Sequence, residues 1–289
     1  KVRIHQIQAL RAIAATLVVL FHAKLAPGGF IGVDIFYVIS GYLITMLMMK
    51  DFEADQFSLA DFWERRFRRI FPALAVMIFF TVSLGFLLLL PEALMNLGAS
   101  LQAQTLFISN LFFWNDSNGY FAGPAEEKAL LHTWSLAVEE QFYIFMPLLC
   151  LLIRSWWAAR PQKKTLRETF FQIFTALLSG SFIAAAVVTW MDSHAAFYWL
   201  PTRAWELMLG STLACLPADK WSVKEKPRAI LAWLALLTIL IVGWVYNKRT
   251  LFPGLAAAPP CLATAFLIWV GQPQLEKTTV SRILASRLL

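Results

Sequence analysis

The stretch FIGVDIFYVISGYLITMLMM, residues 30–49, contains a single charged side chain, that of Asp34. About 20 mostly apolar residues are enough for an α-helix to cross the hydrocarbon core of a bilayer. This stretch therefore predicts a membrane-spanning helix. It decides the class of fold because much of the remaining chain has the same apolar composition.

The composition of the whole chain supports a membrane protein. Of its 289 residues, 59% are hydrophobic and 15% are charged, and 24 are Phe and 12 are Trp. Soluble domains carry about 25% charged residues. These values argue against a soluble enzyme, a disordered chain and a small disulfide scaffold. The three cysteines lie in apolar stretches and show neither a disulfide framework nor the spacing of zinc ligands, so we expect no metal.

Eight stretches are long and apolar enough to predict full spans. A further stretch, residues 93–114, contains Asn, Gln and Ser side chains and could span, re-enter or lie at the interface. The predicted spans are residues 7–25, 30–49, 70–90, 131–153, 170–190, 200–216, 229–246 and 252–270. The predicted fold is an all-α polytopic transmembrane helical bundle that forms one domain, residues 1–289.

The basic residues predict the orientation of these spans. If residues 93–114 do not cross, 19 of the 25 Lys and Arg residues fall on one side of the membrane. Basic residues concentrate in cytoplasmic loops, so we predict that both ends of the chain are cytoplasmic. The net charge of +7 then reflects orientation, and we expect no nucleic-acid partner.

Ionisable side chains within spans are costly and are therefore candidates for function. Arg11 and His22 are eleven residues apart, so a helix places them on one face with a rise of about 16 Å. Asp34 follows a short glycine-containing turn, and we expect it at the depth of His22, where a carboxylate can fix the imidazole tautomer. A buried ion pair that holds the hairpin together is the alternative interpretation.

Four arginines, at positions 65, 66, 68 and 69, precede Pro72. They suit an ordinary cytoplasmic anchor, which composition alone favours, or a site for phosphates, which guanidinium groups bind in pairs of hydrogen bonds.

Two further predicted spans carry polar groups. His132, Ser135 and Glu139 share one helix face, although a single helix rarely supplies the geometry of a catalytic triad. Arg203 and Glu206 are spaced for a local ion pair. The predicted topology places six of these side chains in the outer half of the membrane, where they could face an extracytoplasmic substrate: His22, Asp34, His132, Glu139, Arg203 and Glu206.

Several segments together resemble the acyltransferase-3 family of integral membrane O-acyltransferases. They are Arg11 with His22, GGFIGVDIFYVISGYLIT (28–45), ERRFRRIFPAL (64–74), HTWSLAVEEQFYIFMPL (132–148), PTRAWELMLG (201–210) and LFPGLAAAPPCLATAFLIW (251–269). The last two resemble the subgroup that modifies bacterial surface polysaccharides.

The resemblance implies that acetyl-CoA on the cytoplasmic side donates an acetyl group to a hydroxyl of a polysaccharide or lipid-linked sugar outside, such as lipopolysaccharide O-antigen. It implies a multi-pass protein of the bacterial inner membrane, in contact with membrane lipids, whose last spans and SGNH-type domain lie beyond residue 289. We assign His22, Arg11 and Asp34 to catalysis, and Arg66, Arg68, Arg69 and Arg11 to acetyl-CoA. The expected substrate-binding residues are Glu139, Glu140, His132, Ser135, Arg203 and Glu206.

A transporter or flippase for a lipid-linked sugar or small anion is the alternative, because intramembrane charges suit transporters as well. The sequence shows no paired inverted halves, which a transporter would be expected to have. A non-catalytic scaffold would leave the ionisable groups within the spans unexplained.

Overall fold

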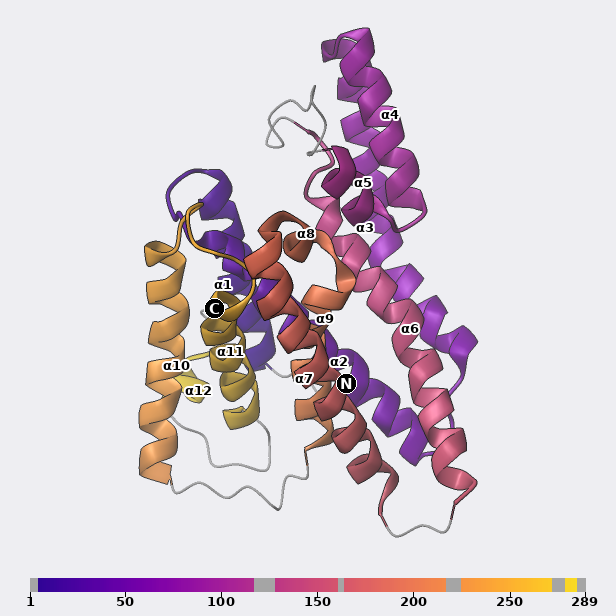
Figure 1. The fold of residues 1–289 in the computed structure, drawn as a ribbon, viewed down its shortest axis with the longest axis vertical. Helices are drawn as coiled ribbons and strands as arrows, with labels where there is room; N and C mark the ends of the chain where they lie inside the picture. The colour runs from indigo at the N-terminus through magenta and orange to yellow at the C-terminus, as the bar shows by residue number, and fades with distance from the viewer. Residues whose placement is uncertain (1–4, 117–127, 161–163, 217–224, 272–278, 285–289) are drawn as a thin grey trace. The chain divides into compact units, whose positions relative to one another are not determined.

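The computed structural model describes residues 5–116, 128–160, 164–216, 225–271 and 279–284 (Figure 1). All regular elements within these ranges are helices, so the predicted all-α class is confirmed. They are α1 (His5–His22), η1 (Gly29–Ile31), α2 (Gly32–Glu53), α3 (Leu59–Leu88), α4 (Pro91–Thr105), α5 (Ser109–Asp116), α6 (Thr133–Ala158), α7 (Leu166–Met191), α8 (Ser193–Tyr198), α9 (Leu200–Cys215), α10 (Glu225–Val245), η3 (Leu255–Ala257), α11 (Ala258–Val270) and α12 (Thr279–Leu284).

Five helical stretches of the described chain are long and apolar enough to cross a membrane, and each overlaps most of a predicted span. The predicted spans at residues 7–25 and 252–270 correspond to shorter apolar helices, and that at residues 200–216 corresponds to the 16 residues of α9. The chain is therefore a multi-pass membrane protein. The five longer stretches are Gly29–Glu53, Leu59–Leu88, Thr133–Ala158, Leu166–Met191 and Pro227–Val245.

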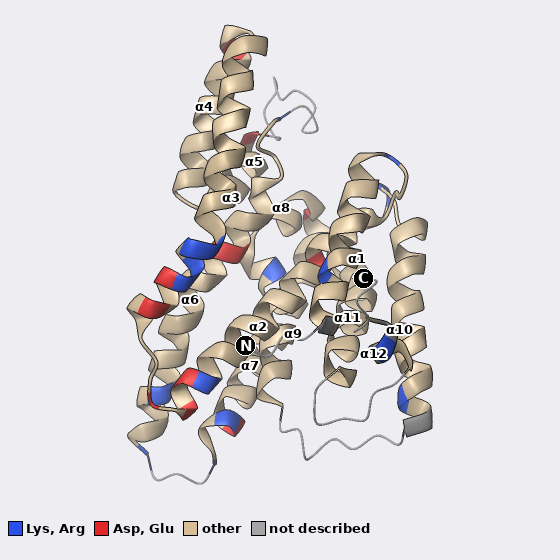
Figure 2. Ribbon diagram, turned by 180° about the vertical axis from the view of Figure 1, so that it is seen from behind, with Lys and Arg blue, Asp and Glu red and all other residues tan. Residues whose placement is uncertain are grey.

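The many apolar side chains cover the outward faces of these helices. Only 6% of the most apolar window of α3 is buried, and large exposed side chains such as Phe79 and Phe86 line it. Charged residues occupy few positions along the helices (Figure 2). In water such surfaces would aggregate, whereas in a bilayer they meet lipid tails. The high Phe content of the sequence thus reflects contact with lipid more than a large core.

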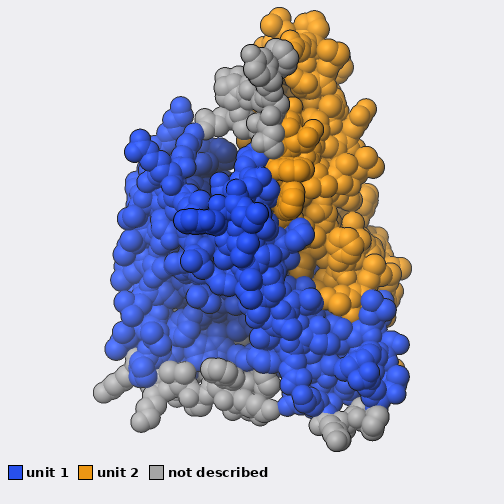
Figure 3. Space-filling model, in the orientation of Figure 1, with its two compact units in different colours: residues 1–49, 150–197, 201–289 blue, residues 50–149, 198–200 orange. Residues whose placement is uncertain are grey.

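The chain forms two compact units, which Figure 3 distinguishes by colour. Unit 1 contains residues 1–49, 150–197 and 201–289, and unit 2 contains residues 50–149 and 198–200. The core of unit 1 brings together α1, α2, α9, α10 and α11. Unit 2 is built on α3, α4, α5 and α6.

Two glycines let α2 and α9 pack backbone to backbone in unit 1. A Cβ atom added to Gly41 would lie 1.8 Å from the carbonyl oxygen of Leu207, and one added to Gly210 would lie 2.0 Å from that of Val38. The hydroxyl of Ser211 also donates a hydrogen bond to the carbonyl of Gly41, at 3.3 Å. Small residues commonly permit such close contacts in membrane helices. This contact fixes α2 against the helix that carries Arg203.

The polar stretch at residues 93–114 forms two helices, α4 and α5, separated by a turn in which Phe107 has a φ of 56°. The side chains of Asn110 and Gln141 exchange hydrogen bonds, and Gln141 also donates to the carbonyl of Phe107 at 2.8 Å. Ser109 donates to the carbonyl of Thr133 at 2.9 Å. The polar residues that weakened this stretch as a span therefore fasten α5 and the turn to α6.

We expect Gly41→Ala and Gly210→Ala each to lower the free energy of unfolding by about 1–3 kcal/mol, because the added methyl group overlaps backbone atoms of the facing helix. Gly180→Ala is the matched control, since nothing lies within 4 Å of its added Cβ atom. Thermal unfolding in detergent measures all three. Equal midpoints for the Gly41 and Gly180 variants would show that the close helix contact does not contribute to stability.

Candidate functional site

Helix α1 carries both members of the predicted Arg–His pair. It is continuous from His5 to His22, so Arg11 and His22 lie on one face with a rise of about 16 Å between them. The Arg11 side chain is half-buried, whereas His22 is exposed at the last residue of the helix. The geometry expected of the pair is therefore present.

Asp34 does not accompany His22 as the sequence analysis predicted. Asp34 is fully buried in the first turn of α2, and its Oδ1 atom lies 3.1 Å from a terminal nitrogen of Arg203. Within the described residues, no hydrogen bond or ion pair joins Asp34 to His22. The contact by which Asp34 would orient the His22 imidazole is therefore absent from the described residues, because the helix packing gives the carboxylate a cationic partner on α9.

Arg203 lies at the centre of this buried cluster. Its other terminal nitrogen lies 3.1 Å from Oε1 of Glu206, which confirms the local pair predicted from spacing. All three side chains are 0% exposed. A membrane interior makes an unpaired charge very costly, so the guanidinium and the carboxylates stabilise one another.

Aromatic rings enclose the guanidinium on its other sides. Its central carbon lies 5.4 Å from the ring centroid of Tyr37, 5.7 Å from that of Phe197 and 5.5 Å from that of Phe252. These distances suit cation–π attraction, which is strongest in a desolvated environment. Arg203 is thus held by charge and by ring contacts together.

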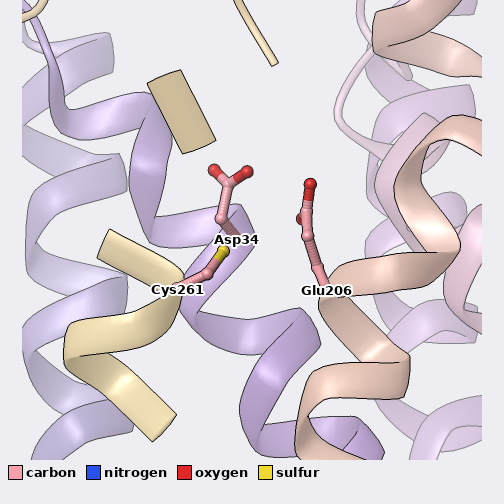
Figure 4. A group of neighbouring side chains, drawn as sticks. All are labelled: Asp34, Glu206 and Cys261. Carbon is pink, nitrogen blue, oxygen red and sulfur yellow. The ribbon is translucent and has the colours of Figure 1, made fainter. Parts of the chain in front are cut away.

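Cys261 of α11 completes the surroundings of the two carboxylates (Figure 4). One ligand atom each from Asp34, Glu206 and Cys261 lies within 4.8 Å of the others, a grouping that could bind a metal ion. However, the Arg203 guanidinium already lies against both carboxylates and supplies the positive charge that a cation would bring. We interpret the group as an ion-pair cluster.

A row of aromatic contacts joins this cluster to His22. The imidazole of His22 meets the ring of Phe21 edge-on at 5.4 Å, and Phe21 meets Phe30 at 5.7 Å. Phe30 in turn lies 4.8 Å from Phe252, the ring beside Arg203. The C-terminal end of α1, which carries His22, therefore packs in one assembly with the buried ion pairs of unit 1.

The predicted acetyl-CoA arginines lie inside α3, and they differ sharply in exposure. Arg66 is 7% exposed, and its guanidinium lies over the rings of Phe62 and Tyr143 at 5.9 and 5.7 Å. The side chain of Arg68 is 78% exposed and pairs with Glu64 at 2.7 Å. Arg69 is also exposed. Burial therefore argues against a simple anchoring role for Arg66, whereas Arg68 and Arg69 are accessible to a ligand.

Two acidic residues of α6 accompany Arg66 within unit 2. Glu139 accepts a hydrogen bond from the Tyr143 hydroxyl, and both Glu139 and Glu140 interact electrostatically with Arg66. The sequence analysis placed Arg66 in a cytoplasmic loop and Glu139 in the outer half of the membrane. That separation is wrong, because α3 already begins at Leu59 and carries Arg66 to the depth of Tyr143.

The remaining predicted substrate-binding residues lie where α6 begins. His132 is exposed, and the hydroxyl of Ser135 donates to the carbonyl of His132 at 3.2 Å. This bond belongs to the first turn of the helix and does not form the nucleophile–base pair of a triad.

Comparison with known proteins identifies the class. The sequence model of a family described as "Acyltransferase domain" matches residues 4–287, and the chain belongs to this family. It is thus an integral-membrane acyltransferase domain. No solved structure matches the chain significantly.

The proteins most informative for comparison include two O-acetyltransferases. The chain is 37% identical over 240 residues to the peptidoglycan O-acetyltransferase OatA of Listeria monocytogenes, a match that covers 81% of this chain and 38% of the relative. It is 32% identical over 256 residues to the O-acetyltransferase OatA of Staphylococcus aureus, covering 82% of this chain and 41% of the relative. An uncharacterized protein of Haemophilus influenzae is 31% identical and matched over 96% of its length. The chain thus spans about two fifths of the two OatA proteins.

We expect Arg203→Met to lower the free energy of unfolding by about 3–5 kcal/mol, because it leaves Asp34 and Glu206 buried without their cation. Combining Arg203→Met with Asp34→Asn and Glu206→Gln removes those charges and should restore part of the loss. Thermal unfolding in detergent, or the folded fraction on size exclusion where the single variant is too unstable, compares the two proteins. A single variant as stable as the wild type would contradict the assigned pairing.

Proposed function

We propose that the protein is an O-acetyltransferase of the bacterial inner membrane. It takes an acetyl group from cytoplasmic acetyl-CoA and delivers it to a hydroxyl of an extracytoplasmic surface polysaccharide. Membership of the acyltransferase family and the names of the two OatA relatives support the reaction class. The Listeria relative is named for peptidoglycan, so the acceptor class we propose includes peptidoglycan beside lipopolysaccharide O-antigen.

One observation supports this proposal above the others: a single continuous helix carries a half-buried Arg11 and ends in the exposed imidazole of His22. Acetyl transfer needs a group that can accept a proton from a sugar hydroxyl or attack a thioester carbon. An accessible imidazole can do either. Among the described side chains of this helix, His22 is the one that offers such a group within reach of a ligand.

Two mechanisms fit this geometry. In the first, His22 accepts the proton of the sugar hydroxyl while the hydroxyl oxygen attacks the thioester carbonyl. The CoA thiolate leaves and takes up a proton. In the second, an imidazole nitrogen attacks the thioester to form acetyl-imidazole, and the CoA thiolate leaves and takes up the imidazole proton. The sugar oxygen then attacks the acetyl carbon, the C–N bond breaks, and the hydroxyl proton passes to the released imidazole nitrogen. The products are the same, an acetylated sugar and CoA.

The donor phosphates have candidate ligands in unit 2. Arg68 and Arg69 are exposed cations on α3, and guanidinium groups bind phosphate oxygens well. The alternative of a transporter or flippase has no comparable support, because the matching family is one of acyltransferases.

We expect His22→Ala to abolish transfer of label from radiolabelled acetyl-CoA to a polysaccharide acceptor in proteoliposomes, because no other imidazole lies on α1 within the described side chains. His194→Ala on α8 is the matched control and should retain transfer. Both variants should insert into the membrane as the wild type does. A His22 variant with wild-type transfer would contradict the catalytic role of His22.

A further inference from the structure

Glu140 of α6 is a buried carboxylate that lacks a hydrogen-bond donor on one oxygen. The side chain is 4% exposed, and its Oε1 atom has no hydrogen-bond partner in the described part of the chain. The neighbouring Glu139, by contrast, accepts a hydrogen bond from Tyr143. A buried acceptor left without a donor costs about 1–3 kcal/mol of stability, so such atoms are rare in native proteins. A ligand that supplies the missing donor is one explanation for this atom.

Arg66 shares this feature from the facing helix. Its Nε atom is buried and likewise has no hydrogen-bond partner among the described residues, although its guanidinium interacts with the rings of Phe62 and Tyr143. Arg66 and Glu140 interact electrostatically. Two neighbouring helices of unit 2 thus each carry a buried polar atom without a hydrogen-bond partner among the described residues, a donor on Arg66 and an acceptor on Glu140.

The charges around these atoms indicate what kind of ligand they can take. Glu140 interacts electrostatically with the carboxylate of Glu139 and the guanidinium of Arg66. Arg65 and Arg69 interact in turn with Arg66. A buried carboxylate oxygen repels the negative charge of a phosphate. A neutral group that carries N–H or O–H donors fits the free carboxylate oxygen better.

Other arginines of α3 can bind phosphates instead. Arg68 and Arg69 follow Arg66 by two and three residues, so their side chains leave α3 in other directions, at about 100° per residue. Both are exposed. The N-terminal half of α3 therefore carries exposed cations near the buried carboxylate of Glu140. CoA has the matching groups, because it combines phosphates with a pantetheine arm that carries amide N–H groups and a hydroxyl.

We propose that Glu140 binds the pantetheine arm of the acyl donor by accepting a hydrogen bond from one of its amide or hydroxyl groups, while the nucleotide phosphates lie on Arg68 and Arg69. The proposal rests on the proposed function, because it takes acetyl-CoA as the donor. Glu140 then binds the acyl donor and not the polysaccharide acceptor.

The test measures binding of CoA and of adenosine 3′,5′-bisphosphate, which has phosphates but no pantetheine, to the protein in detergent by titration calorimetry. Loss of this hydrogen bond should weaken CoA binding by roughly tenfold in Glu140→Leu. Glu140→Gln, which keeps a neutral acceptor and the side-chain shape, should weaken it by roughly fivefold. Binding of the bisphosphate should stay unchanged in both variants.

Glu92→Gln is the matched control, because Glu92 is an exposed glutamate in the first turn of α4 in the same unit. It should bind both ligands as the wild type does, and unfolding midpoints show that each variant is folded. Unchanged CoA binding in Glu140→Leu, or equal weakening of both ligands, would overturn the role of Glu140. A wild-type protein that binds neither ligand would contradict the proposed function itself.

Discussion

The buried Arg203 guanidinium, held between the carboxylates of Asp34 and Glu206, is the interaction on which the core of unit 1 depends. Ionisable groups are tolerated in a membrane interior only when they are paired. Meeting that condition requires α2 and α9 to approach closely, and Gly41 and Gly210 permit this approach. The contacts of Phe252 then extend the assembly through Phe30 to the end of α1.

The second group, Arg66 with Glu139 and Glu140, also combines an arginine with two carboxylates, but its contacts differ. In unit 1 the arginine contacts both carboxylates at 3.1 Å and is enclosed by rings. In unit 2 the buried Arg66 and Glu140 each retain an atom without a hydrogen-bond partner among the described residues. The Arg203 guanidinium forms two close ion pairs, whereas Arg66 and Glu140 form no ion pair within the described residues. This difference distinguishes the structural role of Arg203 from the binding role that we propose for Glu140.

The sequence predicted the features that depend on local pattern. Apolar stretches predicted the long helices, and spacing predicted the pair of Arg203 and Glu206. It did not predict that Asp34 pairs with Arg203, because that contact joins helices far apart in the chain and follows from their packing. The positive-inside rule treated Arg66 as a loop residue, and only the early start of α3 at Leu59 places it beside Tyr143. Long-range contacts of this kind carry no signal in a single sequence.

The proposed function requires that an acetyl group pass through this domain from one side of the membrane to the other. Proteoliposomes with radiolabelled acetyl-CoA on one side only and a polysaccharide acceptor on the opposite side test it most directly. The account predicts that the acceptor becomes labelled when acetyl-CoA is present only on the side corresponding to the cytoplasm. Label that reaches the acceptor only when both substrates are on the same side would contradict it.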